Sequence, residues 1–157
     1  MAKPIMIYTD GAARGNPGPG GYGIVMLSGA HRKELAEGFR LTTNNRMELL
    51  AVIVALETLK FENSEVTVYT DSKYVADAVE KGWLNNWVKK EFKKVKNPDL
   101  WKRFLQVYHK HQVKFVWVKG HANNVENERC DVLAVEASKK PFLLVDQEYE
   151  KEEDSLF

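Results

Sequence analysis

Two short apolar segments of this chain end in the same three residues, Tyr-Thr-Asp. The first closes with Asp10 and the second with Asp71, and a small residue follows each acid, Gly11 or Ser72. Runs rich in β-branched and aromatic residues are typical of buried strands. Ligands of open α/β sheets bind at the carboxyl ends of the strands. We therefore expect two carboxylates at one functional edge of a sheet.

Two further acids stand in distinctive surroundings. Glu48 follows Asn-Asn-Arg-Met at the start of a predicted long helix, and Asp131 ends the run Glu-Asn-Glu-Arg-Cys-Asp. Carboxylates gathered in one crevice lose hydration and repel one another, which is costly unless a cation compensates. The pattern predicts a site for a hard divalent ion and a metal-dependent function.

The elements that must position these acids follow from periodicity and turn residues. Asn44 or Asn45 is expected to cap the first helix and Ser72 the second, and a turn-rich loop is expected over 11–21. Three antiparallel strands followed by strands separated by helices predict an α/β fold, with a mixed five-stranded sheet and helices on both faces. The predicted strands cover 5–10, 22–27, 33–42, 65–71 and 113–118, and the predicted helices cover 44–60, 73–80, 83–96, 97–109 and 125–138.

Composition is typical of a soluble globular chain, with 157 residues of which 44% are hydrophobic and 29% charged. We expect one catalytic domain over residues 1–140, a flexible acidic tail over 141–157, and a monomer. No apolar run approaches the roughly 20 residues of a membrane span. Met-Ala-Lys-Pro leads directly into a strand, so we expect no signal peptide and a cytoplasmic location. The single cysteine, Cys130, excludes an internal disulfide.

The net charge of +1 conceals a strong asymmetry along the chain. Residues 81–119 hold eleven Lys or Arg and two acids, whereas residues 141–157 hold six acids and one Lys. A basic segment beside an active cleft predicts a polyanionic partner, and the acidic end predicts a solvated tail. A less favoured hypothesis is that the acidic end visits the basic segment and competes with nucleic acid.

Six motifs stand in order along the chain. They are Tyr-Thr-Asp-Gly-Ala at 8–12, Gly-Asn-Pro-Gly at 15–18, Thr-Thr-Asn-Asn-Arg-Met-Glu-Leu at 42–49, Tyr-Thr-Asp-Ser at 69–72, Val-Lys-Gly-His-Ala at 118–122 and Glu-Asn-Glu-Arg-Cys-Asp at 126–131. Together they resemble a known family, the bacterial-type ribonuclease H of the type 1 class. The resemblance covers roughly residues 4–137 and implies a ribonuclease H-like fold. It also implies hydrolysis of the RNA strand of RNA–DNA hybrids with little sequence specificity, leaving 5′-phosphate and 3′-hydroxyl ends.

The resemblance assigns catalytic roles by motif. Asp10, Glu48, Asp71 and Asp131 correspond to the four metal-binding acids, and His121 corresponds to a loop histidine that moves protons or assists product release. The implied cofactor is Mg²⁺, as two ions with substrate, for which Mn²⁺ can substitute. Two cations can activate a water and stabilise the leaving oxygen of a phosphodiester. Asp10 is expected to bridge the ions.

The resemblance also implies how the partner, an RNA–DNA hybrid, is held. The Gly-rich loop lets backbone groups approach closely, and a basic, aromatic segment offers stacking faces together with charge for phosphates. A phosphate pocket is implied at Thr43 and Asn97. The full set of expected contacts is Gly11, Ala13, Arg14, Gly15, Asn16, Thr43, Asn44, Asn45, Lys73, Trp83, Lys89, Lys90, Lys93 and Asn97.

Three features depart from the family pattern. The segment between Trp87 and Trp101 is a few residues shorter than in familiar bacterial relatives. Leu41 stands where relatives often carry a basic residue of the phosphate pocket, and Lys73 replaces a frequent glutamine. These departures bear on substrate affinity rather than on the chemistry.

Two other functions remain open at this point. One is a related nuclease that cuts DNA, such as a resolvase or transposase core, against which the Thr-Thr-Asn-Asn and Gly-Asn-Pro-Gly motifs argue. The other is a catalytically silent hybrid-binding module, which would be expected to have lost an acid, yet all four are present.

Overall fold

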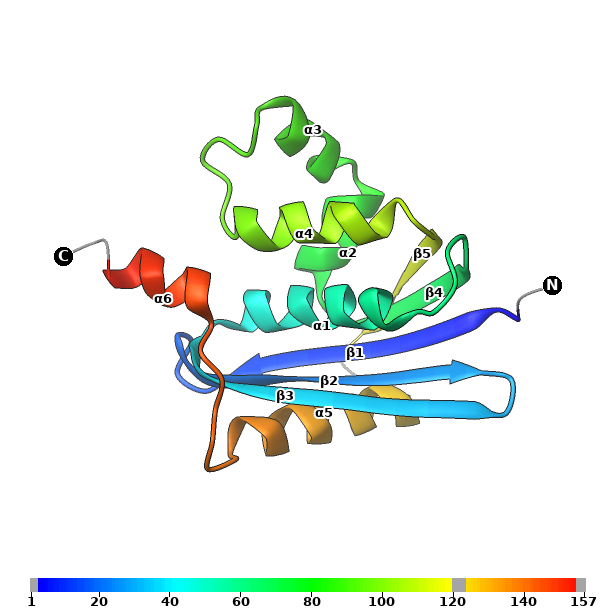
Figure 1. The fold of residues 1–157 in the computed structure, drawn as a ribbon, viewed down its shortest axis with the longest axis horizontal. Helices are drawn as coiled ribbons and strands as arrows, with labels where there is room; N and C mark the ends of the chain where they lie inside the picture. Colours follow the sequence, from blue (N-terminus) through cyan, green and yellow to red (C-terminus); the bar gives the residue numbers. More distant parts are fainter. Residues whose placement is uncertain (1–2, 120–123, 155–157) are drawn as a thin grey trace.

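A five-stranded mixed sheet lies at the centre of the computed structural model, which describes residues 3–119 and 124–154 (Figure 1). The strand order is β3-β2-β1-β4-β5. β1 pairs antiparallel with β2, which pairs antiparallel with β3, whereas β4 runs parallel to β1 and β5 parallel to β4. The predicted fold class is thereby confirmed. The strands are β1 Ile5–Ala13, β2 Gly18–Ser28, β3 His31–Thr42, β4 Glu65–Thr70 and β5 Gln112–Trp117.

The register of β1 against β4 aligns the two Tyr-Thr-Asp segments. Tyr8 pairs with Tyr69, and their rings stack with centroids 4.7 Å apart. Each tyrosine lies two residues before its acid, so Asp10 and Asp71 reach the same edge of the sheet.

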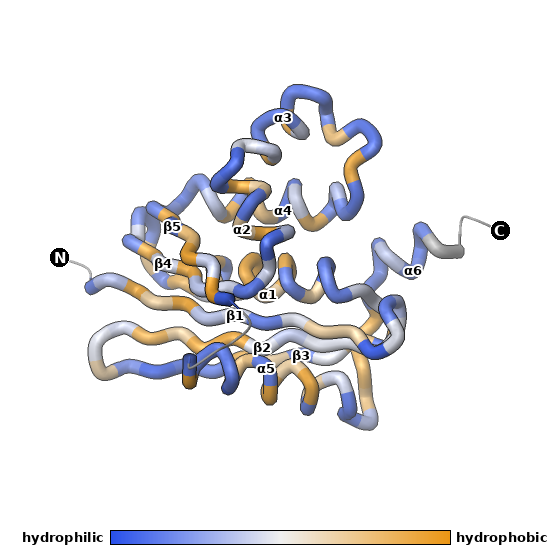
Figure 2. The backbone as a smooth tube through the Cα atoms, turned by 180° about the vertical axis from the view of Figure 1, so that it is seen from behind, coloured by the Kyte–Doolittle hydropathy of each residue, from blue (hydrophilic) through white to orange (hydrophobic). Residues whose placement is uncertain are grey.

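Helices cover both faces of the sheet, as expected. The helix α5 packs on one face and α1 on the other, with α4 packed on the outer side of α1 (Figure 1). Figure 2 shows apolar stretches along β1, β2 and α1, and residues of these elements form much of the hydrophobic core. The helices are α1 Asn44–Thr58, α2 Lys73–Glu80, α3 Trp83–Lys89, α4 Pro98–Tyr108, α5 Val125–Ser138 and α6 Gln147–Asp154.

Capping differs from the prediction at α1 and agrees with it at α2. The Thr43 hydroxyl, rather than an asparagine side chain, accepts a hydrogen bond from the backbone N–H of Arg46 at 3.2 Å. The Asn44 side chain is used elsewhere, since its Oδ1 accepts from the N–H of Ala13 at 2.6 Å. At α2 the Ser72 hydroxyl accepts from the N–H of Val75.

The predicted loop over 11–21 is mostly strand. β1 continues to Ala13 and β2 begins at Gly18, with Gly11 paired to Tyr22 and Ala13 to Gly20. Glycines usually indicate turns, but Gly11 is needed here because β1 packs closely against α1. A Cβ on Gly11 would lie 2.4 Å from the backbone N of Glu48 in α1.

The predicted helix over 83–96 is wrong beyond Lys89. The backbone at Glu91, Phe92 and Lys94 has positive φ of 53–59°, which a right-handed helix does not allow. Continuing α3 would also place Lys89 near Lys93 and Lys90 near Lys94, and like charges four residues apart destabilise a helix.

The segment 141–154 differs from the flexible tail that was expected. Leu144 forms an isolated parallel bridge with Phe39 of β3, and its N–H donates to the carbonyl of Gly38 at 2.9 Å. Asp146 is buried, and α6 follows it at the end of the sheet near the start of α1 (Figure 1). The acidic composition of this segment gave no sign that one of its carboxylates, that of Asp146, is buried and paired with Arg46 of α1.

Among the described residues no helix combines the length and the apolar character needed to cross a bilayer.

Candidate active site

Three of the predicted metal ligands meet at the carboxyl edge of β1 and β4. One carboxylate oxygen from each of Asp10, Glu48 and Asp71 lies within 4.8 Å of the others. Asp10 and Glu48 are buried, and Asp71 is half-buried. Residues far apart in the chain thus form one compact cluster of hard oxygen donors.

Close packing of α1 on β1 brings Glu48 into this cluster. The N–H of Gly11 donates to Glu48 Oε1 at 3.1 Å. A side chain at position 11 would collide with the first turn of α1, where a Cβ would lie 2.4 Å from the backbone of Met47 and Glu48. Glycine at this position therefore lets the helix start approach the strand and sets Glu48 beside Asp10.

Electrostatics in the cluster are unfavourable for three negative charges. Burial raises the pKa of Glu48 well above its usual range, and the neighbouring charges of Asp10 and then Asp71 raise it further. Glu48 Oε2 is buried and receives no N–H or O–H among the described residues. A divalent cation would supply the missing partner for this oxygen and relieve the repulsion, so the donor set fits a hard metal ion.

The fourth predicted ligand, Asp131, lines the same pocket but stands outside the tight cluster. The pocket, of about 410 Å³, also includes Asn44, Asn45 and Lys73. Asp131 is exposed on α5. His121, the predicted proton carrier, lies outside the described residues.

Comparison with known proteins agrees with this geometry. The family model for RNase H matches residues 2–139. The chain belongs to the ribonuclease H family. It is 60% identical over 149 residues to a ribonuclease H of Desulforamulus reducens, which covers 92% of this chain and 93% of that protein. Family membership and the acidic cluster together show a metal-dependent hydrolase.

Solved ribonuclease H structures share the fold. The crystal structure of LC9-RNase H1, a type 1 RNase H with the type 2 active-site motif, has a TM-score of 0.79 at 30% identity, covering 88% of this chain and 73% of that one. The structure of LC11-RNase H1 in complex with an RNA/DNA hybrid has a TM-score of 0.61 at 32% identity, covering 85% of this chain and 95% of that one.

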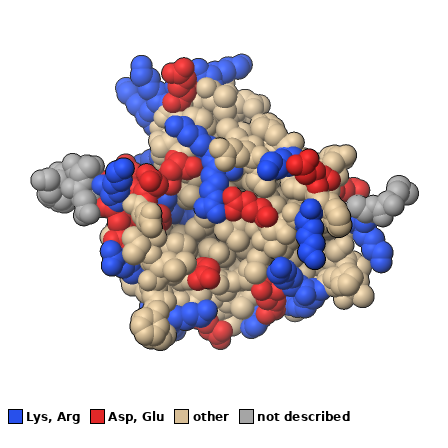
Figure 3. All heavy atoms as spheres, in the orientation of Figure 1, with Lys and Arg blue, Asp and Glu red and all other residues tan. Residues whose placement is uncertain are grey.

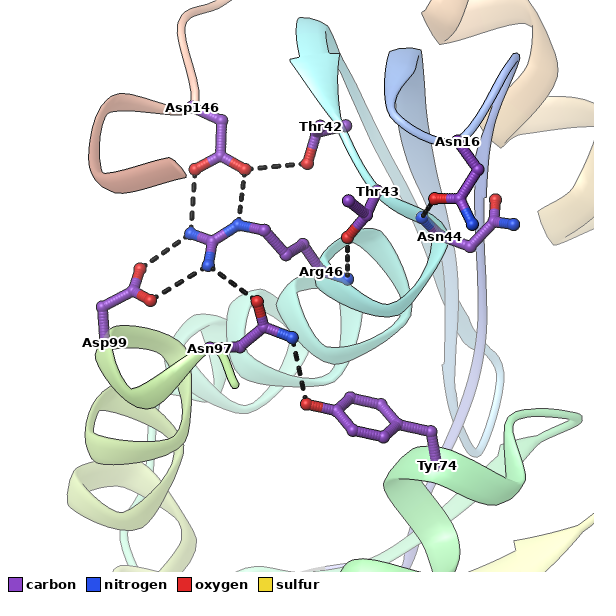
Figure 4. Close-up of polar contacts among 9 residues, drawn as sticks. All are labelled: Asn16, Thr42, Thr43, Asn44, Arg46, Tyr74, Asn97, Asp99 and Asp146. Atoms are coloured by element: carbon purple, nitrogen blue, oxygen red, sulfur yellow. Dashed lines mark hydrogen bonds and ion pairs between the residues drawn. The ribbon is translucent and has the colours of Figure 1, made fainter. Parts of the chain in front are cut away.

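Several predicted nucleic-acid contacts, among them Gly11, Asn44 and Asn45, line the acidic pocket, and others lie in the β1–β2 turn. Asn16 Oδ1 accepts from the N–H of Asn44 at 3.0 Å, which fixes the turn against the helix (Figure 4). Gly15 lies in this turn with φ of 78°. Arg14 reaches the other way, and its Nη2 donates to the carbonyl of Ser138 at the end of α5 at 3.1 Å. That contact directs one guanidinium N–H of Arg14 away from the pocket.

The predicted phosphate contacts, Thr43 and Asn97, share a second pocket of about 380 Å³. Asn97 is held there by two hydrogen bonds: Oδ1 accepts from Arg46 Nη1 at 3.2 Å, and Nδ2 donates to the Tyr74 hydroxyl at 3.0 Å (Figure 4). The sequence reading missed three other members of this pocket, Lys96, Tyr149 and Glu152. Lys96 directly precedes Asn97 in the sequence, so its position next to a predicted phosphate contact could have indicated it.

The predicted basic segment stands away from the sheet. Lys89, Lys90 and Lys93 are exposed around the end of α3, and 41% of Trp83 is exposed. Figure 3 shows Lys and Arg side chains gathered over this part of the molecule. Trp101, by contrast, is fully buried in the core.

Lys73, one of the predicted nucleic-acid contacts, lines the acidic pocket itself. Its ammonium lies 4.7 Å from the centre of the Trp117 ring, and the Trp117 indole N–H donates to the carbonyl of Asp71 at 3.0 Å. The ammonium group of Lys73 therefore packs on the Trp117 ring in the pocket that holds the carboxylate cluster.

Proposed function

We propose that this chain is an endonuclease that hydrolyses the RNA strand of RNA–DNA hybrids with little sequence specificity, leaving 5′-phosphate and 3′-hydroxyl ends. One observation carries the proposal: the carboxylates of Asp10, Glu48 and Asp71 converge within 4.8 Å in a member of the ribonuclease H family. The hybrid bound by LC11-RNase H1 supports the choice of substrate.

The proposed cofactor is Mg²⁺, as two ions with substrate, and Mn²⁺ is expected to substitute. Asp10, Glu48 and Asp71 would hold one ion, and Asp10 with Asp131 would hold the other. When bound, such ions lower the pKa of a bound water and stabilise negative charge on the leaving oxygen. The buried, unpaired oxygen of Glu48 and its raised pKa support this assignment, because both indicate a site that favours a cation.

Other groups of the chain would position the carboxylates and transfer a proton. Asp10 sits on the central strand of the sheet, where it pairs with Gly23 of β2. The N–H of Gly11 orients Glu48 through Oε1 and leaves Oε2 directed to the ligand. His121 is proposed to move a proton or assist product release, since imidazole changes charge near neutral pH.

The hybrid is proposed to lie across the acidic pocket with its RNA strand against the β1–β2 turn. Its DNA strand would run past the phosphate pocket toward the basic segment at the end of α3. The proposed RNA-side contacts are Gly11, Ala13, Arg14, Gly15, Asn16, Asn44 and Asn45, and the proposed DNA-side contacts are Thr43, Lys73, Trp83, Lys89, Lys90, Lys93 and Asn97.

A cleavage assay on matched substrates tests the proposal. Native protein and the Asp10→Asn variant are incubated with an end-labelled hybrid, the corresponding duplex DNA and the corresponding single-stranded RNA, each with Mg²⁺ or with EDTA. Cleavage of the RNA strand of the hybrid, by native protein with Mg²⁺ alone, is the expected result. Cleavage of duplex DNA would indicate a resolvase-like nuclease instead, and hybrid binding without cleavage would indicate a silent binding module.

A further inference from the structure

The phosphate pocket has a wall that comes from the C-terminal segment. Seven residues line it: Asn16, Thr43, Asn45, Lys96, Asn97, Tyr149 and Glu152. The first five come from the β1–β2 turn, the start of α1 and the start of α4, and the last two from α6. Asn45 also lines the acidic pocket, so the two pockets adjoin.

A buried ion-pair network fixes α6 in this position. Arg46 is 2% exposed, and Asp146 accepts from its Nε at 2.7 Å and its Nη2 at 2.9 Å (Figure 4). Asp99 accepts from the other side of the same guanidinium at 3.0 and 2.7 Å, and Asn97 takes the remaining N–H. All five N–H donors of Arg46 are thereby used. Because Arg46 contacts both Asn97 and Asp146, one side chain holds the pocket and the base of α6 together.

Two further contacts hold α6. Arg40 Nε and Nη2 both donate to the Glu150 carboxylate, at 3.0 and 2.8 Å. The Tyr149 ring lies over the Arg46 guanidinium, 5.7 Å from its carbon to the ring centre. These contacts hold α6 beside the pocket, so the helix is part of the pocket's structure.

The charges that line the pocket oppose each other. Lys96 is its cation and Glu152 its anion, and both side chains are exposed; the other five side chains are neutral. Lys96 therefore brings a positive charge that would attract a phosphate, and Glu152 of α6 brings a negative charge to the same pocket. Figure 3 shows acidic side chains gathered where α6 lies.

We propose that Lys96 is the cation that selects a DNA-strand phosphate in this pocket and that α6, through Glu152, weakens that same contact. This inference rests on the proposed function, because the ligand is a phosphodiester of the hybrid. Lys96 and Glu152 set the affinity for substrate and take no part in the bond cleavage. The acidic C-terminal segment thus acts on the phosphate pocket, and not on the basic segment around α3.

Binding without cleavage tests the inference directly. Fluorescence anisotropy in EDTA measures the affinity of full-length protein for a labelled hybrid, with Glu152→Gln and Lys96→Gln as the variants. Glu65→Gln and Lys33→Gln are the matched controls, since both residues are exposed, Glu65 at the start of β4 and Lys33 in the hairpin of β2 and β3. Thermal unfolding confirms that each variant is folded.

Opposite shifts are expected from the two variants. Glu152→Gln should tighten binding about two- to fivefold and Lys96→Gln should weaken it by a similar factor, as expected for exposed charge pairs. Both effects should shrink as salt rises toward 0.5 M, because screening shortens the reach of exposed charges. The controls should shift affinity by less than either variant.

A scan of neutral linkages identifies the phosphate. A series of hybrids carries one methylphosphonate each along the DNA strand, and native protein should show one linkage at which neutralisation weakens binding most. Lys96→Gln should lose sensitivity at that linkage and keep it elsewhere. If native protein cleaves the hybrid but both variants bind like the controls, or if Lys96→Gln keeps the native methylphosphonate profile, the inference fails while the proposed function stands. If native protein does not cleave the hybrid, the proposed function fails and takes the inference with it.

Discussion

Replacing Asp10 with Asn should abolish cleavage and yet stabilise the metal-free protein. Asp10 and Glu48 are only 3% and 8% exposed, and their carboxylate oxygens lie within 4.8 Å of each other and of Asp71. Two charges at such a separation repel by roughly 3.5 kcal/mol at an effective dielectric constant of about 20. The native protein escapes part of this repulsion when Glu48 binds a proton, so the expected gain is about 1–3 kcal/mol, or roughly 3–10 °C in Tm for a chain of this size.

The gain should depend on pH in a defined direction. The pKa of Glu48 is raised in the folded state, first by burial and then by Asp10. The folded state therefore binds more protons than the unfolded state between the ordinary glutamate pKa and the raised one. Stability of the metal-free native protein is accordingly highest below the ordinary pKa and falls as pH rises toward the raised value. Asp10→Asn should flatten this fall, so its advantage should be largest at the alkaline end.

Thermal unfolding in EDTA across pH 4–9 measures the effect. Glu65→Gln, which removes one exposed carboxylate at the other end of β4, is the matched control and should follow the native curve. Added Mg²⁺ should stabilise the native protein more than Asp10→Asn. Equal or lower stability of Asp10→Asn at alkaline pH would refute the argument that the carboxylates of the cluster repel one another.

Three further predictions concern the scaffold around the site. Arg46→Ala should lower the free energy of unfolding by about 3–5 kcal/mol in urea titrations, because it leaves the buried carboxylate of Asp146 without its cation. Arg40→Ala removes a side chain that is 60% exposed and should lower the free energy of unfolding by less than about 1 kcal/mol. Similar losses in the two variants would contradict the buried network. Gly11→Ala should lower the free energy of unfolding by about 1–3 kcal/mol. It should also reduce kcat, because the added Cβ displaces α1 and with it Glu48. An unchanged kcat would show that catalysis does not need the close approach of α1 to β1. Cys130 is fully buried, and burial raises the pKa of its thiol. A thiol reagent should therefore modify Cys130 only after denaturation, and rapid labelling of the folded protein would contradict its burial.

The sequence predicted the sheet and the acidic cluster because their signals are local and repeated. Each Tyr-Thr-Asp segment is a strand followed by its own acid, and a parallel register then makes the two acids neighbours. Glu48 was assigned by the family resemblance, and its burial could not be derived from its own segment. The position of Glu48 depends on the close approach of α1 to Gly11. From the sequence alone, Gly11 was interpreted as a turn residue.

The C-terminal segment was misread for a different reason. Asp146 and Glu150 lie among other acids, which is the composition of a solvated tail, and their partners are a hundred residues or more away in the chain. Arg46 belonged to a recognised motif but was given no role. A buried arginine with five donors requires carboxylates from elsewhere, and only the folded structure shows which ones supply them.

Calorimetric titration with Mg²⁺ in the absence of nucleic acid tests the central claim most directly, because it reports on the carboxylate cluster without relying on catalysis. Native protein and Glu65→Gln should bind the ion alike, and Asp10→Asn and Glu48→Gln should each lose that binding. Binding of Mg²⁺ to Asp10→Asn as tight as to the native protein would contradict the account, since the converging side chains would then not be what holds the metal.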